Sequence, residues 1–370
     1  MDKTIKKYFK IFPNCIPVKG YTQSVILDLQ ANTHLFIPNV LLEVLIRLEK
    51  NEFIKVQEKY RNEYGFEITD FINSLLSKNI GFYTDTPASF KKLNKTWHTP
   101  YLITNIVINY SDILTLGPTK TEKVLETDCI SVIIEKYSFE KSTPLTKFLT
   151  AFNYDTVQFY IDKIIDEAEV RELEKEFPAL THIYMLNCSD NSIRQVGGVL
   201  IVRSITQTIP FIQEQTKCKN SFLTNIPLFL ESQEHNTYFN RKLFIEKNGA
   251  IKNAPESEES FGNWIDYSGS GQLLEIIAKP EYQKYWKVHK GLCDVCSHCE
   301  YRYNCVDNRK PIQRNENEWY FETECNYNPF IGKWSNEPGY RTLNECGISC
   351  DIDRMTIEKE KLRNIINELS

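Results

Sequence analysis

The chain has 370 residues, of which 41% are hydrophobic and 25% are charged, so it can build a sizeable core and is neither disordered nor collagen-like. Its formal net charge of −5 excludes the global basic field typical of nucleic-acid-binding proteins. The apolar runs are shorter than the ~20 residues that span a bilayer, and no apolar signal segment follows the N-terminus. We therefore expect a cytoplasmic protein with no membrane and no nucleic-acid partner.

Residues 1–83 predict a small unit of strands followed by helices. Residues 24–30 alternate apolar and polar side chains, and after a turn at 31–33 a second strand is expected at 34–37. Apolar residues recur at helical spacing in 40–48 and again in 68–76. With a last strand at 80–83, this order is typical of a winged-helix-like module. The polar stretch 84–100, which ends in a proline, predicts a linker.

Residues 101–234 predict strands and helices in alternation. The expected strands are 103–110, 130–136, 157–162, 183–188 and 198–203, and the expected helices are 142–152 and 167–177. This alternation indicates βα units and a mainly parallel sheet, either an incomplete barrel or an open sheet. The segment contains no GxGxxG, GxxxxGK[ST], GxSxG or HExxH motif. The overall fold class is therefore α/β.

A third region, 235–335, is expected to form a separate cysteine-rich domain, followed by a tail at 336–370. Asn248-Gly249 predicts a hairpin between the strands 243–247 and 250–252. Residues 272–277 and 282–286 predict one or two helices, and a polar helix is expected at 354–369.

Seven of the 11 cysteines fall between residues 293 and 350. Such a cluster is more typical of a metal site than of a disulfide framework in a reducing compartment. The core of the cluster is CxxCxxCx5C, with one further cysteine downstream: Cys293, Cys296, Cys299, Cys305 and Cys325. Four thiolates satisfy either tetrahedral Zn²⁺ or a [4Fe–4S] cube, and spacing alone does not separate the two.

The cysteine arrangement resembles the SPASM domain that follows the barrel of peptide-modifying radical SAM enzymes. More closely, the whole chain resembles the SPASM-domain peptide maturases of grasp-with-spasm systems, which pair such a protein with an ATP-grasp ligase and a precursor peptide. The matching motifs run through most of the length: FPNCIPVKG (12–20), DLQANTHLFIPN (28–39), ITN (103–105), NIPLF (225–229), ESQEHNT (231–237), NRK (240–242), FGN (261–263), KYW (284–286), CSHCEYRYNC (296–305) and CNYNPF (325–330).

The resemblance implies one cluster where full SPASM domains hold two. The ligands of one cluster match at Cys296, Cys299, Cys305 and Cys325. The ligands of the other would fall near Tyr238, at Ala254 and at Asn308, and none of these is cysteine. We therefore expect one [4Fe–4S] cluster, with zinc as the alternative. Cys293 is either a free thiol or a substitute ligand.

Radical chemistry requires a CxxxCxxC motif after the first barrel strand, where three thiolates hold the cluster that binds S-adenosylmethionine. The corresponding loop, 111–124, contains no cysteine, and Cys346 and Cys350 form a CxxxC with no third cysteine. No S-adenosylmethionine is therefore expected, although the resemblance implies a barrel of radical SAM type for 101–234.

The N-terminal module resembles the small winged-helix modules that bind leader peptides in ribosomal-peptide pathways. The resemblance implies that the leader adds as a strand beside His34, Leu35, Phe36 and Ile37. The leading hypothesis is an accessory, non-catalytic maturation protein that binds the precursor leader and cooperates with an ATP-grasp ligase. The alternatives are an iron–sulfur redox enzyme that modifies the peptide and a zinc-stabilised scaffold unrelated to peptide maturation.

Overall fold

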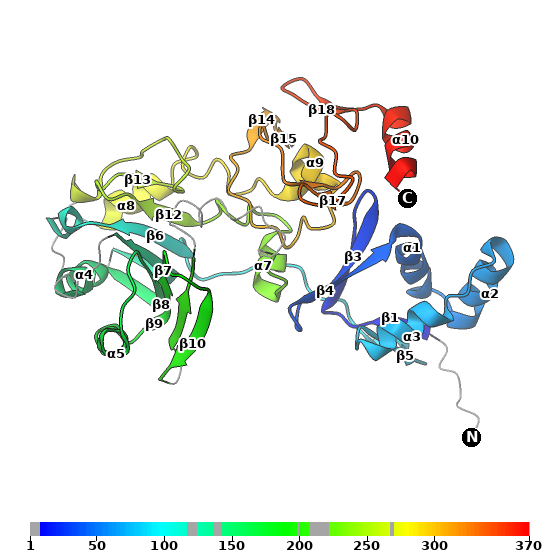
Figure 1. The fold of residues 1–370 in the computed structure, drawn as a ribbon, viewed down its shortest axis with the longest axis horizontal. Coiled ribbons are helices and arrows are strands. Elements are labelled where there is room, and N and C mark those ends of the chain that lie inside the picture. The colour runs from blue at the N-terminus through cyan, green and yellow to red at the C-terminus, as the bar shows by residue number, and fades with distance from the viewer. Residues whose placement is uncertain are drawn as a thin grey trace.

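A computed structural model describes residues 8–116, 124–135, 142–197, 200–206, 222–266 and 270–369. Figure 1 shows the N-terminal unit at one end of the molecule and a large sheet at the other, with the cysteine-rich region between them. Parts of three segments discussed above lie outside the described residues. They are residues 117–123 of the loop 111–124, residue 136 of the strand expected at 130–136, and residues 198–199 of the strand expected at 198–203.

The N-terminal unit contains two small sheets and three helices. β1 (Tyr8–Ile11) pairs with β5 (Gly81–Thr84), and a three-stranded antiparallel sheet has the order β2-β3-β4. Its strands and the helices that follow are β2 (Cys15–Lys19), β3 (Gln23–Asp28), β4 (Thr33–Pro38), α1 (Asn39–Leu48), α2 (Phe53–Tyr64) and α3 (Thr69–Ser77). The strands predicted at 24–30 and 34–37 and the helices predicted at 40–48 and 68–76 are confirmed.

Both faces of the three-stranded sheet are covered, which explains why β3 is apolar on successive residues. Ile26 packs with the buried faces of α1 to α3, whereas Val25 and Leu27 on the opposite face pack against Phe229. A strand covered on both faces loses the alternation of a surface strand. Between β5 and β6 the only regular element is a 3-10 turn at Pro87–Ser89, as expected for the connecting stretch 84–100.

The large sheet has eight strands in the order β10-β11-β9-β8-β7-β6-β12-β13. The six inner strands are parallel and the two edge strands are antiparallel to their neighbours. The strands are β6 (Asn105–Tyr110), β7 (Leu125–Ile134), β8 (Phe152–Ile161), β9 (Leu180–Met185), β10 (Ser192–Val196), β11 (Leu200–Ser204), β12 (Lys242–Ile245) and β13 (Ile251–Lys252). The prediction of an α/β fold with a mainly parallel sheet is confirmed, and the described strands form an open sheet.

One face of this sheet is covered by α4 (Ser142–Leu149), α5 (Glu167–Glu176) and α8 (Ser270–Ile277), which share one buried apolar cluster with the strands. Figure 1 shows α4 and α5 on the same side of the sheet. Asp166 caps α5, because its carboxylate accepts from Glu169 N and the Glu169 side chain accepts from Asp166 N. The Asn248-Gly249 hairpin is confirmed between β12 and β13, with Gly249 at φ 87°.

β12 and β13 extend the large sheet, so residues beyond 235 complete a sheet that was expected to end before them. The cysteine-rich region itself has short elements only. They are α9 (Asp294–Ser297), β14 (Ile312–Asn315), β15 (Glu318–Tyr320), β16 (Tyr327–Asn328) and β17 (Lys333–Trp334), with 3-10 turns at Trp264–Asp266 and Lys290–Leu292. Outside this region, a 3-10 turn at Asp112–Leu116 follows β6, and α7 (Ile226–Glu231) precedes β12.

The C-terminal segment differs from the expected helix 354–369. Met355–Ile357 forms β19, which pairs with β18 (Ile348–Cys350), and the helix α10 spans Lys359–Leu369. The hairpin forms because Ile348 is buried in a local core that Met355 and Ile357 also contact. The helical pattern of 354–357 is therefore overridden by tertiary packing.

Candidate functional site: a four-cysteine cavity

Four of the predicted ligands surround one cavity. Cys296 lies in α9, Cys299 and Cys305 lie in the turns that follow, and Cys325 lies two residues before β16. All four line a cavity of about 260 Å³. The structure therefore brings together the complete set of four cysteines expected from the sequence.

The four cysteines of this cavity are partly buried. Burial raises the pKa of Cys299, Cys305 and Cys325, and neighbouring thiolates raise each of these pKa values further. Thiols with raised pKa values stay protonated at neutral pH unless a cation holds them as thiolates. The site is thus suited to a bound metal centre and poorly suited to a free nucleophilic thiolate.

The two other cysteines near the loop have different positions. Cys293 is buried against Val288 and Trp319, outside the cavity lining, and its Sγ lies 3.7 Å from the carbonyl oxygen of His289. Cys350, in β18, does line the cavity. The sequence had suggested Cys293 as the extra candidate and left Cys350 unassigned, because the C-terminal hairpin that carries Cys350 to the cavity has no spacing signal.

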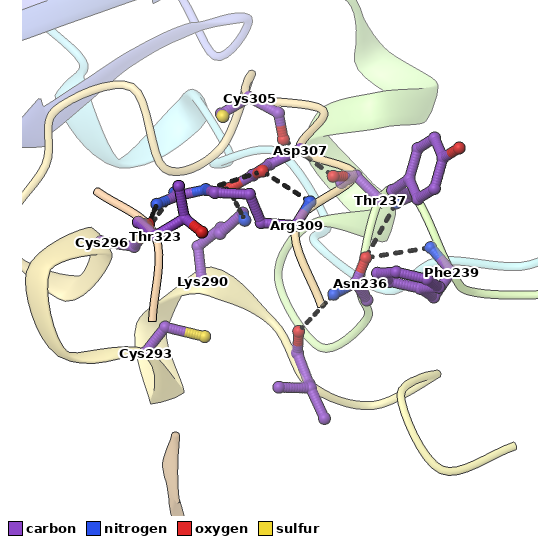
Figure 2. Close-up of polar contacts among 12 residues, drawn as sticks. Asn236, Thr237, Phe239, Lys290, Cys293, Cys296, Cys305, Asp307, Arg309 and Thr323 are labelled. Carbon is purple, nitrogen blue, oxygen red and sulfur yellow. Dashed lines mark hydrogen bonds and ion pairs between the residues drawn. The ribbon is translucent and has the colours of Figure 1, made fainter. Parts of the chain in front are cut away.

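A buried charge cluster lies against the thiols. Lys290 Nζ and Arg309 Nη2 each lie 2.7 Å from Asp307 Oδ2, and the three side chains are 2–8% exposed. Burial by itself would raise the pKa of Asp307, but the two cations hold it well below its usual range. Arg309 Nη2 also lies 4.0 Å from Cys296 Sγ (Figure 2). Two cations and one carboxylate leave a net positive charge beside the thiols, which favours their anionic form.

The backbone of the cysteine loop is fixed from the large sheet's side. The hydroxyl of Thr237 donates to the carbonyl oxygen of Cys305 at 2.8 Å. Asn236 accepts from the backbone N–H of Tyr238 and of Phe239 and donates to the carbonyl oxygen of Val288. Figure 2 shows this segment beside the charge cluster. The residues just before β12 therefore position both Cys305 and the approach to α9.

Tyr238 and Asn308, two of the three positions at which the resemblance implies absent ligands, meet at one carboxylate. Tyr238 Oη donates to Glu256 Oε2 at 2.6 Å, and Asn308 Nδ2 donates to Glu256 Oε1 at 2.9 Å. Ala254, two residues before Glu256, is fully buried. Lys242 Nζ lies 3.2 Å from the centre of the Tyr238 ring. Protein side chains thus fill this region with a hydrogen-bonded network.

Lys242 gives this network a measurable signature. Burial lowers the pKa of Lys242 to about 7, although Glu256 and Glu231 oppose the shift. A folded-state pKa below the unfolded value of about 10.4 means that wild-type stability falls as pH decreases from about 10 to 7. Lys242→Met has no such pH-dependent loss. As pH falls from about 10 to 7, the unfolding free energy of the variant minus that of wild type should therefore rise by up to about 4 kcal/mol, and this difference should stay constant below pH 7. Urea unfolding at several pH values measures the difference.

The matched control for this comparison is Lys279→Met, because Lys279 is exposed. Its unfolding free energy should track wild type at every pH. A Lys242→Met difference that does not change with pH would mean that Lys242 keeps an ordinary pKa in the folded protein.

The turn between β2 and β3 docks onto the cysteine loop. Three hydrogen bonds join them: Tyr21 N to His298 O (2.8 Å), Gln23 Nε2 to Glu300 Oε1 (2.9 Å) and Arg302 Nη1 to Lys19 O (2.6 Å). A Cβ at Gly20 would lie 2.5 Å from the carbonyl oxygen of Gln23, so the tight turn requires glycine there. His298, Glu300 and Arg302 all lie between Cys296 and Cys305 in the sequence. A metal centre held by these cysteines would therefore fix the loop that makes this contact.

The residues expected to bind a peptide lie on β4, at an edge of its sheet. Leu35 and Ile37 pack into the core of the N-terminal unit, whereas the rings of His34 and Phe36 lie 6.3 and 5.6 Å from the ring of Tyr301. The four side chains therefore do not line one groove. A partner strand would have to pair with the main chain of β4, which is the edge strand of its sheet.

No known family model and no curated protein matches this chain. None of the helices in the described ranges is both long and apolar enough to cross a membrane. The function must therefore be argued from the residues and their geometry.

Proposed function

We propose that this chain is an accessory maturation protein for ribosomally synthesised, post-translationally modified peptides, which binds the precursor leader and cooperates with an ATP-grasp ligase. The observation that carries the proposal is the open edge of β4 beside the cysteine loop. Three antiparallel strands followed by three helices support a leader-recognition module of winged-helix type at residues 8–83. The assignment of 101–234 to a partial radical-SAM-type barrel and of 235–335 to a SPASM-like domain, and the ligase as partner, rest on the resemblance given above.

The hydrogen-bond pattern identifies which β4 groups would receive an added strand. Gly20 N donates to Gln23 O and Leu29 N donates to Asn14 O, so the odd-numbered residues of β3 bond to β2. The even-numbered residues of β3 then bond to β4, and they face Thr33, Leu35 and Ile37. The N–H and C=O groups of His34 and Phe36 consequently point away from β3, and no strand among the described residues pairs with that edge of β4. An extended peptide can satisfy them by strand addition.

The four-cysteine cavity supports a [4Fe–4S] cluster better than zinc. A zinc ion needs its four sulfurs about 2.3 Å from a single centre. A cube binds one thiolate per iron and so holds four sulfurs around a larger volume, in keeping with four thiols around a cavity of about 260 Å³. Lys290 and Arg309 would offset the negative charge of the thiolate-ligated cluster.

When bound, the cluster would cross-link Cys296, Cys299, Cys305 and Cys325. This cross-link would restrain the loop residues Glu300, Tyr301 and Arg302. These residues contact the β2–β3 turn and the rings on β4. The proposed role of the site is therefore to fix the cysteine loop against the N-terminal unit, so that a peptide on β4 lies at a defined place relative to the rest of the chain.

A pair of variants at His34 tests strand addition. His34→Pro removes one outward N–H, a change that an edge strand tolerates, whereas His34→Ala keeps this N–H and removes only the ring. A synthetic leader segment of the proposed precursor peptide should bind His34→Ala within a few-fold of wild type. The same leader should bind His34→Pro at least about tenfold more weakly than wild type. One hydrogen bond to the added strand is lost, and the pyrrolidine ring of the proline displaces that strand. Titration calorimetry measures both, and equal affinities for the two variants would contradict strand addition.

A further inference from the structure

Among the residues that the structure describes, the helices that pack on the large sheet cover one of its two faces. Ile106, Ile108, Ile130, Val132 and Phe159 are fully buried in the cluster that includes α4, α5 and α8. Side chains alternate along each strand, so the residues between them lie on the opposite face. That opposite face is mostly half-buried and is largely polar.

Two cross-strand rows define the opposite face. The first row runs from β6 to β11 through Val107, Ser131, Gln158, His182 and Ile201; the second runs through Asn109, Ile133, Tyr160, Tyr184 and Arg203. We call these ten residues the polar sheet face. They include one arginine and one histidine and no acidic residue.

The polar sheet face carries hydrogen-bonding groups without partners. The Arg203 guanidinium lies 6.0 Å from the Tyr184 ring centre, has no ion pair or hydrogen bond to a described residue, and has a buried, unsatisfied Nε. Asn109 Oδ1 is likewise buried and unsatisfied. A buried polar atom without a hydrogen bond is costly in a folded protein. A polar ligand that accepts from Arg203 Nε and donates to Asn109 Oδ1 would remove this cost.

Aromatic rings and charge on the face narrow the chemistry of that ligand. The Tyr160 and Tyr184 rings stack at 4.5 Å beside Arg203. The acids that follow β7 and β12, Glu135 and Glu246, each pair with a lysine, and Arg203 forms no ion pair with a described residue. A guanidinium of this kind recognises a carboxylate.

We propose that the polar sheet face binds an acidic peptide in an extended conformation, with a peptide carboxylate accepting from Arg203 and a peptide N–H donating to Asn109. From β6 to β11 the face spans four strand spacings, or about 19 Å, which matches about six extended residues. Tyr160 and Tyr184 provide an apolar platform for the peptide between these two polar contacts. This site lies on a different sheet from β4 and does not rest on leader binding.

A fluorescein-labelled octaglutamate peptide tests this proposal by fluorescence anisotropy with the full chain, with octaglutamine as the uncharged probe. Octaglutamate should bind, octaglutamine should bind at least tenfold more weakly, and Arg203→Gln should weaken octaglutamate at least tenfold. Arg203→Lys, which keeps the charge but not the planar fork, should show a smaller loss. His34→Pro should bind octaglutamate as wild type does, which separates this site from β4.

Tyr184→Leu is the second variant, because it removes the ring beside Arg203 without changing charge, and it should also weaken octaglutamate binding. Thermal melting of each variant shows whether it is folded. No octaglutamate binding to wild type, or unchanged binding by folded Arg203→Gln and Tyr184→Leu, would overturn the proposal.

Discussion

Replacement of Cys299 by serine is expected to abolish binding of the proposed metal centre and destabilise the cysteine-rich region. Cys299 lines the four-thiol cavity and is followed directly by the residues that dock onto the N-terminal unit. Because metal binding energy at such sites contributes to folding, the loss should exceed about 4 kcal/mol. Protein purified without oxygen should lose its iron and sulfide, or its zinc, and limited proteolysis should cut within residues 293–330.

Cys346→Ser is the matched control for this experiment. Cys346 is fully buried in the C-terminal core and does not line the cavity, so this variant should keep its full metal content. Wild type with about four irons and sulfides per chain would support the cube, whereas one zinc and no sulfide would leave a structural staple. If Cys299→Ser retains metal content, protease resistance and melting temperature, Cys299 is not a ligand.

Replacement of Asp307 by alanine is expected to cost about 3–5 kcal/mol, because it leaves two buried cations without their shared carboxylate. Lys290 and Arg309 are 5% and 8% exposed, so water does not compensate for the lost ion pair. Without Asp307 the two cations would move apart. This movement would also disturb Cys296, whose Sγ lies 4.0 Å from Arg309 Nη2. Urea unfolding measures the loss.

An exposed ion pair of the same length provides the comparison. Arg171 Nη2 and Glu167 Oε1 also lie 2.7 Å apart, but both side chains are more than half exposed. Glu167→Gln should therefore change the free energy of unfolding by less than about 0.5 kcal/mol. Similar losses in the two variants would mean that Asp307 is accessible to water in the folded protein.

The local elements of this chain follow closely from its sequence. The strands at 24–30 and 34–37, the helix at 40–48 and the Asn248-Gly249 hairpin occur where the side-chain pattern places them, because apolar periodicity and turn residues are properties of short segments. Two predicted helical segments are exceptions: residues 282–286 form turns, and Met355 and Ile357 pack with Ile348 as a strand. In the second segment a contact distant in sequence outweighs a local helical pattern.

The candidate site shows the same division. Spacing grouped the five cysteines from Cys293 to Cys325, and the resemblance to SPASM domains implied which four of them are ligands. Neither could show that Cys350 reaches the same cavity, that Asp307 joins Lys290 to Arg309, or that Tyr238 and Asn308 meet at Glu256. Each of these contacts joins segments whose separation along the chain carries no periodic signal.

The sequence by itself determined the α/β class, most element positions and the presence of a cysteine cluster, because these depend on residue type and spacing over short stretches of chain. Only the tertiary structure decided that β12 and β13 complete the large sheet, that the β2–β3 turn docks between the candidate ligands, and that Arg203 lies on the polar sheet face, opposite the described helices. The reason is physical: strand partners, charge neighbours and the covering of a face are set by packing between distant segments, where burial and pairing compete across the whole chain.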